Sequence, residues 1–188
     1  MYVKLFMKFK GMDEEFMYIE NGNLVIRNAT ANDVPLLCSW WNDGKLMAHA
    51  GFPNGIGCTE QDILQNLLTD TDLNRRLILD IDGVPSGEMN YRTIADGTAE
   101  IGIKICDSNE QDKGFGTVFL TMLINFLFVN MGYRTIVLDT NAKNSRAQHV
   151  YENIGFRKVA LHLNSWKNQL GEWQSSIDYE LTRAEFRN

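Results

Sequence analysis

The pattern of hydrophobic and polar positions predicts a chain in which strands and helices alternate. The segment 99–105 shows this most clearly: its odd-numbered positions are apolar and its even-numbered ones are Glu, Gly and Lys, the period of a half-buried strand. Two capping boxes, Thr30 with Asp33 and Thr59 with Asp62, predict helix starts. The other expected strands are 24–27, 76–81, 86–92, 135–139, 158–166 and 174–181, and the expected helices are 30–41, 59–68, a long one from 114, and 144–153. This order favours the α/β (α+β) class, with a mixed sheet and helices on both faces.

Composition and charge exclude several classes of protein. Of the 188 residues 44% are apolar, which is enough to form a core. The contents of charged residues, 22%, and of aromatic residues, 11%, argue against disorder. Acidic residues outnumber basic ones by 24 to 18, which is the wrong sign for a nucleic-acid binder. Residues 1–94 hold 13 acidic and 8 basic side chains, so this half favours a cationic small molecule as its partner.

One uncharged stretch, 114–133, is long enough to span a bilayer. It contains three glycines and two asparagines and lacks a basic flank, so a buried core helix is favoured over a membrane span. Three widely spaced cysteines, Cys38, Cys58 and Cys106, indicate reduced thiols, and the three histidines share no metal-ligand spacing. With no signal peptide visible in residues 1–10, we expect a soluble, cytoplasmic protein without a metal.

The candidate chemistry begins at 111–117, Gln-Asp-Lys-Gly-Phe-Gly-Thr, between the strand 99–105 and the long helix. Glycines let a backbone approach a ligand closely, and the amides that open a helix favour an anion such as a pyrophosphate. The segment is a poor P-loop, because Thr117 follows Gly116 without a lysine, and a poor dinucleotide fingerprint, because position 119 is Phe. Taken alone, it is equally compatible with a tight strand–helix turn.

A second motif follows the next predicted strand. Residues 144–156 read Asn-x-x-Ala-x-x-x-Tyr-x-x-x-Gly-Phe, and residues 111–116 read Gln-x-x-Gly-x-Gly. In this order the two motifs resemble those of the GNAT superfamily of acetyl-CoA-dependent N-acetyltransferases, over roughly residues 24–182. The short N-terminal helix and the closing hairpin resemble the ribosomal-protein N-acetyltransferase-like branch of that superfamily.

The resemblance implies a fold and a domain organisation. The fold is a central mixed, mostly antiparallel sheet that splays between its fourth and fifth strands, with helices on both faces. A single acetyltransferase domain would cover residues 24–188. Residues 1–23 would form an N-terminal extension of unknown role.

The resemblance also implies that acetyl-CoA lies in the gap between those two strands. Backbone amides would cradle the pyrophosphate, a strand edge would bind the pantetheine, Asn144 would contact the cofactor, and Tyr151 would contact it and protonate the departing thiolate. The residues so implied are Gln111, Lys113, Gly114, Phe115, Gly116 and Thr117 for the pyrophosphate, and Ile103, Lys104 and Ile105 for the pantetheine. The family often has Arg in place of Gln111, so phosphate affinity here should rest more on backbone donors and Lys113.

The acceptor side can be argued from chemistry. A primary amine is protonated at neutral pH and must lose a proton before it attacks a thioester, which calls for a base. Glu88 and Glu100 lie on predicted strands and are the candidates, with a solvated surface carboxylate as the alternative for each. Glu88 shares a strand face with Asn90. These two residues, together with Trp40 and Trp41, are the predicted acceptor-binding set, although core packing competes for the tryptophans.

The expected reaction is acetyl transfer from acetyl-CoA to a primary amine by direct attack in a ternary complex, because no cysteine lies in the motifs as an acyl carrier. A protein N-terminus, a polyamine or another small amine could serve as the acceptor. An aminoglycoside-type antibiotic acetyltransferase and a non-catalytic acyl-CoA-binding module are the alternatives; Tyr151 argues against the module, since a binder needs no thiolate acid. We expect no nucleic-acid or membrane partner, and a homodimer through the terminal strands or helices is one assembly open to the chain.

Overall fold

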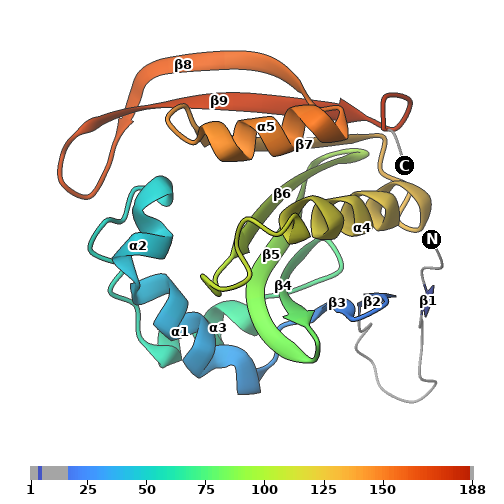
Figure 1. Cartoon of the computed structure of the whole chain (residues 1–188), viewed down its shortest axis with the longest axis horizontal. Helices are drawn as coiled ribbons and strands as arrows, with labels where there is room; N and C mark the ends of the chain where they lie inside the picture. Colours follow the sequence, from blue (N-terminus) through green and yellow to red (C-terminus); the bar gives the residue numbers. More distant parts are fainter. Residues whose placement is uncertain (1–3, 6–16, 187–188) are drawn as a thin grey trace.

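Nine strands form one sheet in the computed structural model, which describes residues 4–5 and 17–186 (Figure 1). Their order across the sheet is β1-β2-β3-β4-β5-β6-β7-β9-β8. The strands are β1 (Lys4–Leu5), β2 (Tyr18–Asn21), β3 (Leu24–Asn28), β4 (Asn74–Ile81), β5 (Val84–Ala95), β6 (Thr98–Ile105), β7 (Thr135–Asn141), β8 (Arg157–Lys167) and β9 (Trp173–Thr182). All neighbours pair antiparallel except β6 and β7, so the sheet is mixed and mostly antiparallel, as predicted.

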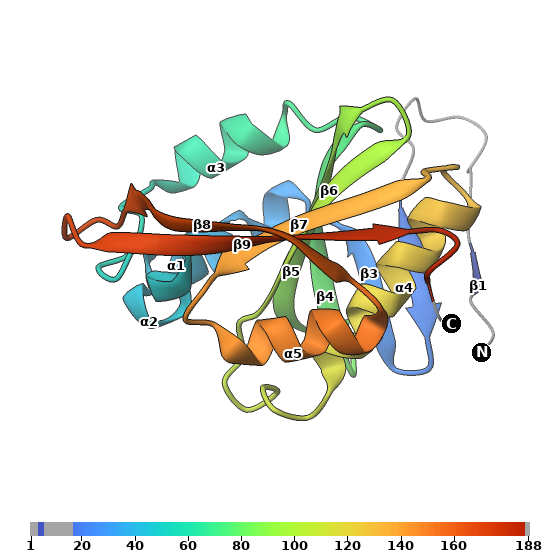
Figure 2. The ribbon, with the colours of Figure 1, turned by 90° about the horizontal axis from the view of Figure 1, so that it is seen from above.

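Helices cover both faces of this sheet (Figure 2). They are the short 3-10 turns η1 (Ala31–Asp33) and η2 (Ala48–Ala50) and the α-helices α1 (Val34–Asn42), α2 (Gly44–Met47), α3 (Glu60–Leu67), α4 (Phe115–Val129) and α5 (Ser145–Ile154). The period of β4 explains why there are two cores. Leu77 and Leu79 pack in the cluster that contains α4, whereas Ile78 packs in the cluster that contains α1 and α3.

The sheet splays between β6 and β7. These parallel strands pair only through Thr98 with Thr135, Ala99 with Ile136 and Glu100 with Val137. β6 then continues to Ile105 and β7 to Asn141 without pairing to each other. The edge of β6 that follows Glu100 therefore has free backbone groups on the side facing β7, where a ligand can bind them. This confirms the splay expected between the fourth and fifth predicted strands.

The tip of the closing hairpin fixes the loop that follows η2. Gln169 joins three parts of this loop: its backbone N donates to the Gly51 oxygen at 2.8 Å, its Nε2 donates to the Gly55 oxygen at 3.0 Å, and its Oε1 accepts from the Asn54 N at 3.0 Å. Gly51 is required here, because a Cβ at this position would lie 2.4 Å from the Trp166 ring. The contact holds α2 and η2 in place beside the splay (Figure 1).

Local differences from the predicted elements have local causes. Asn42-Asp43-Gly44 does not end the helical region, because the Asp43 carboxylate accepts from the Lys45 and Leu46 amides and opens α2. The predicted boundary at residue 23 falls within the hairpin of β2 and β3. In the part of the proposed extension that precedes this hairpin, the structure describes only residues 4–5 and 17. Among the described helices none is long and apolar enough to cross a membrane.

Candidate functional site

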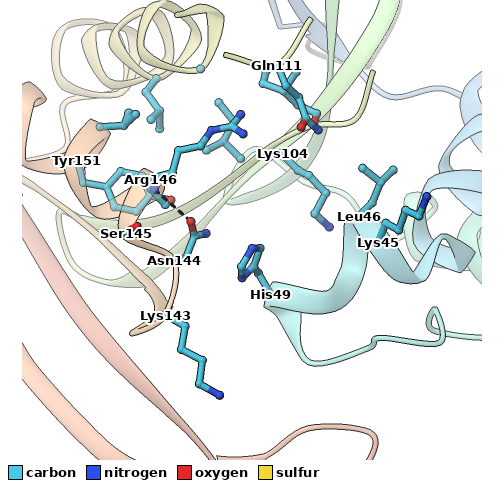
Figure 3. Close-up of a pocket in the computed structure, with 16 residues that line it drawn as sticks. Lys45, Leu46, His49, Lys104, Gln111, Lys143, Asn144, Ser145, Arg146 and Tyr151 are labelled. Atoms are coloured by element: carbon cyan, nitrogen blue, oxygen red, sulfur yellow. Dashed lines mark hydrogen bonds between the residues drawn. The ribbon is translucent and has the colours of Figure 1, made fainter. Parts of the chain in front are cut away.

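A cavity of about 430 Å³ opens where β6 and β7 separate (Figure 3). Its lining comes from α2 and η2, β6, the start of α4, and the start of α5. The residues are Lys45, Leu46, His49, Ile103, Lys104, Ile105, Gln111, Gly116, Leu120, Lys143, Asn144, Ser145, Arg146, Ala147, Val150 and Tyr151. The two motif segments of the sequence therefore meet at one cavity, hereafter the cleft.

The glycine-rich segment borders the cleft with a bare backbone. Gly114 has a φ of +84° and is the N-cap of α4, a conformation that favours glycine. Gly116 has no such constraint, and a Cβ there would meet only Ile105 Cγ1, at 4.0 Å. Packing within the protein therefore does not require a glycine at 116. Its missing side chain leaves space in the cleft beside the amides that open α4, where an anion can bind.

The cleft is cationic although the chain as a whole is acidic. Lys45, Lys104, Lys143 and Arg146 line it, and none of the described residues that line it is acidic. Figure 3 shows Lys143 and Arg146 on one side and Lys45 on the other. Lys45 and Lys143 lie in segments for which the sequence indicated no chemistry. Arg146 lies at a position of the second motif to which no role was assigned. The cleft suits a ligand with several negative charges.

Tyr151 lines this cleft from α5 and is 8% exposed. Its ring packs edge-on against Tyr179, with 5.6 Å between centroids. Burial and then the charge of Asp139 raise the pKa of Tyr151 to about 12. Within the described part of the chain its hydroxyl has no hydrogen-bond partner. The group can therefore hold its proton at neutral pH and offer it to a ligand.

The structure divides the predicted pyrophosphate residues. Gln111 and Gly116 line the cleft, and Gln111 Nε2 donates to the Ile105 oxygen at 2.9 Å, closing the end of β6. Lys113 does not line the cleft; its ammonium pairs with Glu110 at 3.1 Å. The cations that line the cleft near this segment are Arg146, which pairs with Asp112 at 3.3 Å, and Lys143.

The remaining motif residues make contacts that stabilise the helix starts and the core. Phe115 packs against the core, and the Thr117 amide donates to the Gly114 oxygen at 3.1 Å. Asn144 caps α5, since its Oδ1 accepts from the Ala147 amide at 3.2 Å, and it lines the cleft from that position. Its Nδ2 is then left for a ligand.

A second cavity, of about 530 Å³, lies against the same strand and shares Ile103 and Lys104 with the cleft. We call it the acceptor-side cavity. Its lining comes from α1, α2, α3, the loop before α3, and strands β4 to β6. The residues are Trp41, Met47, Ile56, Cys58, Asn66, Arg76, Glu88, Asn90, Gly102, Ile103 and Lys104. The two cavities thus meet at one point on β6.

Glu88 is the carboxylate of the acceptor-side cavity and is 5% exposed. Trp41 Nε1 donates to both of its oxygens at 3.0 Å, and Arg76 Nη1 donates to Oε2 at 3.0 Å. The Lys104 ammonium lies 3.6 Å from Oε1. Two cations and an indole thus compensate the cost of burying this charge.

Two other predicted residues do not reach either cavity. Glu100 forms an ion pair with Arg92, 2.7 Å from Nη2, and is the last residue of β6 that pairs with β7. Trp40 is a buried core residue in the cluster of Leu37 and Ile63 and, unlike Trp41, does not line the cavity. The geometry thus brings Glu88, Asn90 and Trp41 together and places Glu100 and Trp40 outside both cavities.

Sequence reasoning missed several residues that the structure places in the two cavities. Arg146 lies within the second motif and Lys143 directly precedes it, so their positions carried a usable signal. His49, one of the three histidines without metal-ligand spacing, lines the cleft opposite Asn144 (Figure 3). Arg76 carried no signal, because only the pairing of β4 with β5 places it beside Glu88.

A splayed sheet around a cationic cleft, with a bare helix start at its edge, defines an α/β protein with a cleft that can hold a polyanionic ligand. The sequence model of the acetyltransferase (GNAT) domain matches residues 23–157. The chain therefore belongs to the GNAT acetyltransferase family and is an acyltransferase enzyme.

Solved structures of that family share the fold. The spermidine N-acetyltransferase from Vibrio cholerae, solved with CoA and spermine, has a TM-score of 0.78 and 19% identity over 89% of this chain and all of its own. The ribosomal L7/L12 alpha-N-protein acetyltransferase in its apo form has a TM-score of 0.77 and 16% identity, over 94% and 99% of the two chains. A GNAT acetyltransferase from Bacillus anthracis has a TM-score of 0.75 and 21% identity, over 90% and 100%.

Proposed function

We propose that this protein is an N-acetyltransferase that transfers the acetyl group of acetyl-CoA to a primary amine by direct attack in a ternary complex. One observation carries the proposal: the cleft and the acceptor-side cavity meet at Ile103 and Lys104. Two ligands held in the two cavities can therefore touch without an acyl-enzyme step. The relatives solved with CoA support the choice of donor.

The cleft fits acetyl-CoA on its own features. The coenzyme carries several phosphate charges, and the cleft offers Lys143, Arg146 and the amides around Gly116 without a lining carboxylate. Its pantetheine arm is a chain of amides, which can pair with the free edge of β6 after Glu100. When bound, acetyl-CoA supplies a thioester carbonyl carbon, to which the amine nitrogen bonds as the carbon–sulfur bond breaks.

Residues of this chain handle the two protons of the reaction. Tyr151 holds a proton at its hydroxyl oxygen for the leaving sulfur, and the pKa of about 12 keeps that proton in place at neutral pH. On the other side of β6, Glu88 receives the proton that the amine must lose. Arg76 and Lys104 assist, because neighbouring cations favour the neutral form of an amine.

The proposal includes a location. The chain has three free cysteines, of which Cys106 is buried. Free thiols are typical of a reducing compartment, and we place the enzyme in the cytoplasm.

The test is calorimetric titration of the purified protein with acetyl-CoA, followed by a thiol-release assay across primary amines. We expect micromolar binding of the donor, and release of CoA thiol that depends on an amine. Donor binding without release by any amine would instead favour the acyl-CoA-binding module. No donor binding would overturn the proposal altogether.

A further inference from the structure

The acceptor-side cavity has the opposite charge from the one that the composition suggests. Residues 1–94 hold 13 acidic and 8 basic side chains, which favoured a cationic partner. Among the described residues that line this cavity, however, the charged ones are Arg76, Lys104 and Glu88. Two cations face one carboxylate, and that carboxylate is already in contact with both. A polycationic acceptor would meet an excess of positive charge here.

Arg76 is held rigidly and still has donors to offer. Its Nη1 donates to Glu88 Oε2 at 3.0 Å, and its guanidinium stacks on the Trp41 ring at 4.8 Å from the centroid. A guanidinium has five N–H donors, and in the described part of the chain the remaining side-chain donors of Arg76 have no acceptor. The side chain is 29% exposed, so these donors can reach the cavity. A fixed planar fork of this kind matches a carboxylate.

The size and depth of the cavity limit the ligand. A volume of about 530 Å³ is that of a small-molecule site. Arg76 lies on β4, whereas the meeting point with the cleft lies on β6, at Ile103 and Lys104. β5 and the side chains of Glu88 and Asn90 lie between the two. An acceptor that spans this distance would place one end at Arg76 and the other at the thioester.

We propose that the acceptor is a primary amine that also carries a carboxylate, which Arg76 binds while the amine faces Ile103. This inference rests on the proposed acetyl transfer and names the substrate class for it. Glu88 then has two tasks: its Oε2 fixes Arg76 by the ion pair, and its Oε1, beside Lys104, lies toward the amine end. Two sources have this chemistry: a small amino acid, and an acidic residue next to a peptide N-terminus.

The test uses three acceptors with the same five-carbon chain. 5-Aminopentanoate ends in a carboxylate, 5-aminopentanamide in a neutral amide, and 1,5-diaminopentane in an ammonium. In the thiol-release assay we expect kcat/KM for the carboxylate to exceed that for the amide by about tenfold or more, with the diamine lowest. Two hexapeptides that differ only in Glu or Gln at position 2 form a second arm, and a preference seen only there identifies a peptide as the source of the carboxylate.

Two variants assign the preference to a residue. Arg76→Gln should reduce kcat/KM for 5-aminopentanoate to the value for the amide, mainly through KM, while Arg76→Lys retains part of the preference. Arg134→Gln removes one positive charge from an exposed pair with Asp96, outside both cavities, and should leave the preference intact. Unchanged acetyl-CoA affinity shows that each variant is folded.

Other outcomes overturn the inference. Equal turnover of the acceptors in both arms, or fastest turnover of the diamine, contradicts it and leaves acetyl transfer standing. A carboxylate preference that survives in Arg76→Gln contradicts the assignment to Arg76. Release by no amine in a broad panel, despite donor binding, overturns the inference and the proposed function together.

Discussion

The two cavities on β6 are built in different ways. The cleft takes most of its lining from two continuous segments, 111–120 and 143–151, each at the start of a helix. The acceptor-side cavity takes its polar side chains from separate elements: Trp41 from α1, Arg76 from β4, Glu88 from β5 and Lys104 from β6. The cleft is therefore built largely by the local backbone geometry of two segments, whereas the acceptor-side cavity is built from side chains that only the folded sheet assembles.

The two cavities also treat charge differently. None of the described residues that line the cleft is acidic, although Arg146 pairs with the exposed Asp112 at 3.3 Å and Lys104 with Glu88 at 3.6 Å from outside that lining. In the acceptor-side cavity Arg76 and Lys104 surround Glu88, so most of the charge there is compensated within the protein. We therefore expect changes in the cleft to alter donor binding, and changes in the acceptor-side cavity to alter catalysis and acceptor choice.

The largest effect expected is that of Tyr151→Phe. The hydroxyl is the proton source that we assign to the leaving sulfur, and loss of a general acid lowers turnover by roughly 10² or more. The ring and its contact with Tyr179 remain, so acetyl-CoA affinity should hold in calorimetry. Since the pKa of Tyr151 is raised to about 12, wild-type turnover should also show no loss from this group up to pH 9. Unchanged turnover in the variant would remove Tyr151 from the mechanism.

The second comparison separates the two candidate bases. Glu88→Gln keeps the shape of the side chain but loses the charge that faces Arg76, Lys104 and the proposed amine site. We expect kcat/KM for the amine to fall by at least about tenfold, with donor affinity unchanged.

Glu100→Gln is the matched control on the neighbouring strand. Its carboxylate pairs with Arg92 outside both cavities, and an exposed pair of this kind contributes little. Turnover should stay close to that of the wild type. A strong loss in Glu100→Gln with none in Glu88→Gln would reverse our assignment.

The smallest effect expected concerns the cleft alone. Gly116→Ala puts a methyl group into space that the protein leaves open, so acetyl-CoA should bind several-fold more weakly, by roughly 1 kcal/mol. The free energy of unfolding should not fall, because alanine favours a helix over glycine. Gly114→Ala is the contrast: at φ +84° it is strained, and it should lower stability by about 1–2 kcal/mol. Equal donor affinity in Gly116→Ala and wild type would place the coenzyme elsewhere.

Much of the fold could be predicted because its signals are local. Strict alternation identified β6, and capping boxes marked helix starts; at α3 both halves of the box form, with Thr59 N donating to Asp62 Oδ2 at 2.8 Å and Asp62 N donating to Thr59 Oγ1 at 3.2 Å. The start of α2 was missed, because the cap at Asp43 looks like a helix end in the sequence. The roles assigned to Tyr151, Asn144 and Glu88 stay predictions.

The placement of Glu88 shows where sequence reasoning ends. The turn Asp82-Gly83 joins β4 to β5 and pairs Ile81 with Val84 and Asp80 with Pro85. Counted evenly from that turn, Glu88 would oppose Leu77 and face the core under α4. A register shift between Leu79 and Asp80 adds one residue on β5, so Glu88 opposes Ile78 and faces the other side of the sheet.

The sequence by itself determined the cleft of this protein: the order of the elements, the glycine-rich helix start and the second motif lie in continuous segments whose local backbone preferences are strong. Only the tertiary structure decided the acceptor side. A shift of one residue moves every side chain of a strand to the opposite face, and side chains from four elements come together only once that register is fixed. The bulge in β5 therefore sets which charges line the acceptor-side cavity.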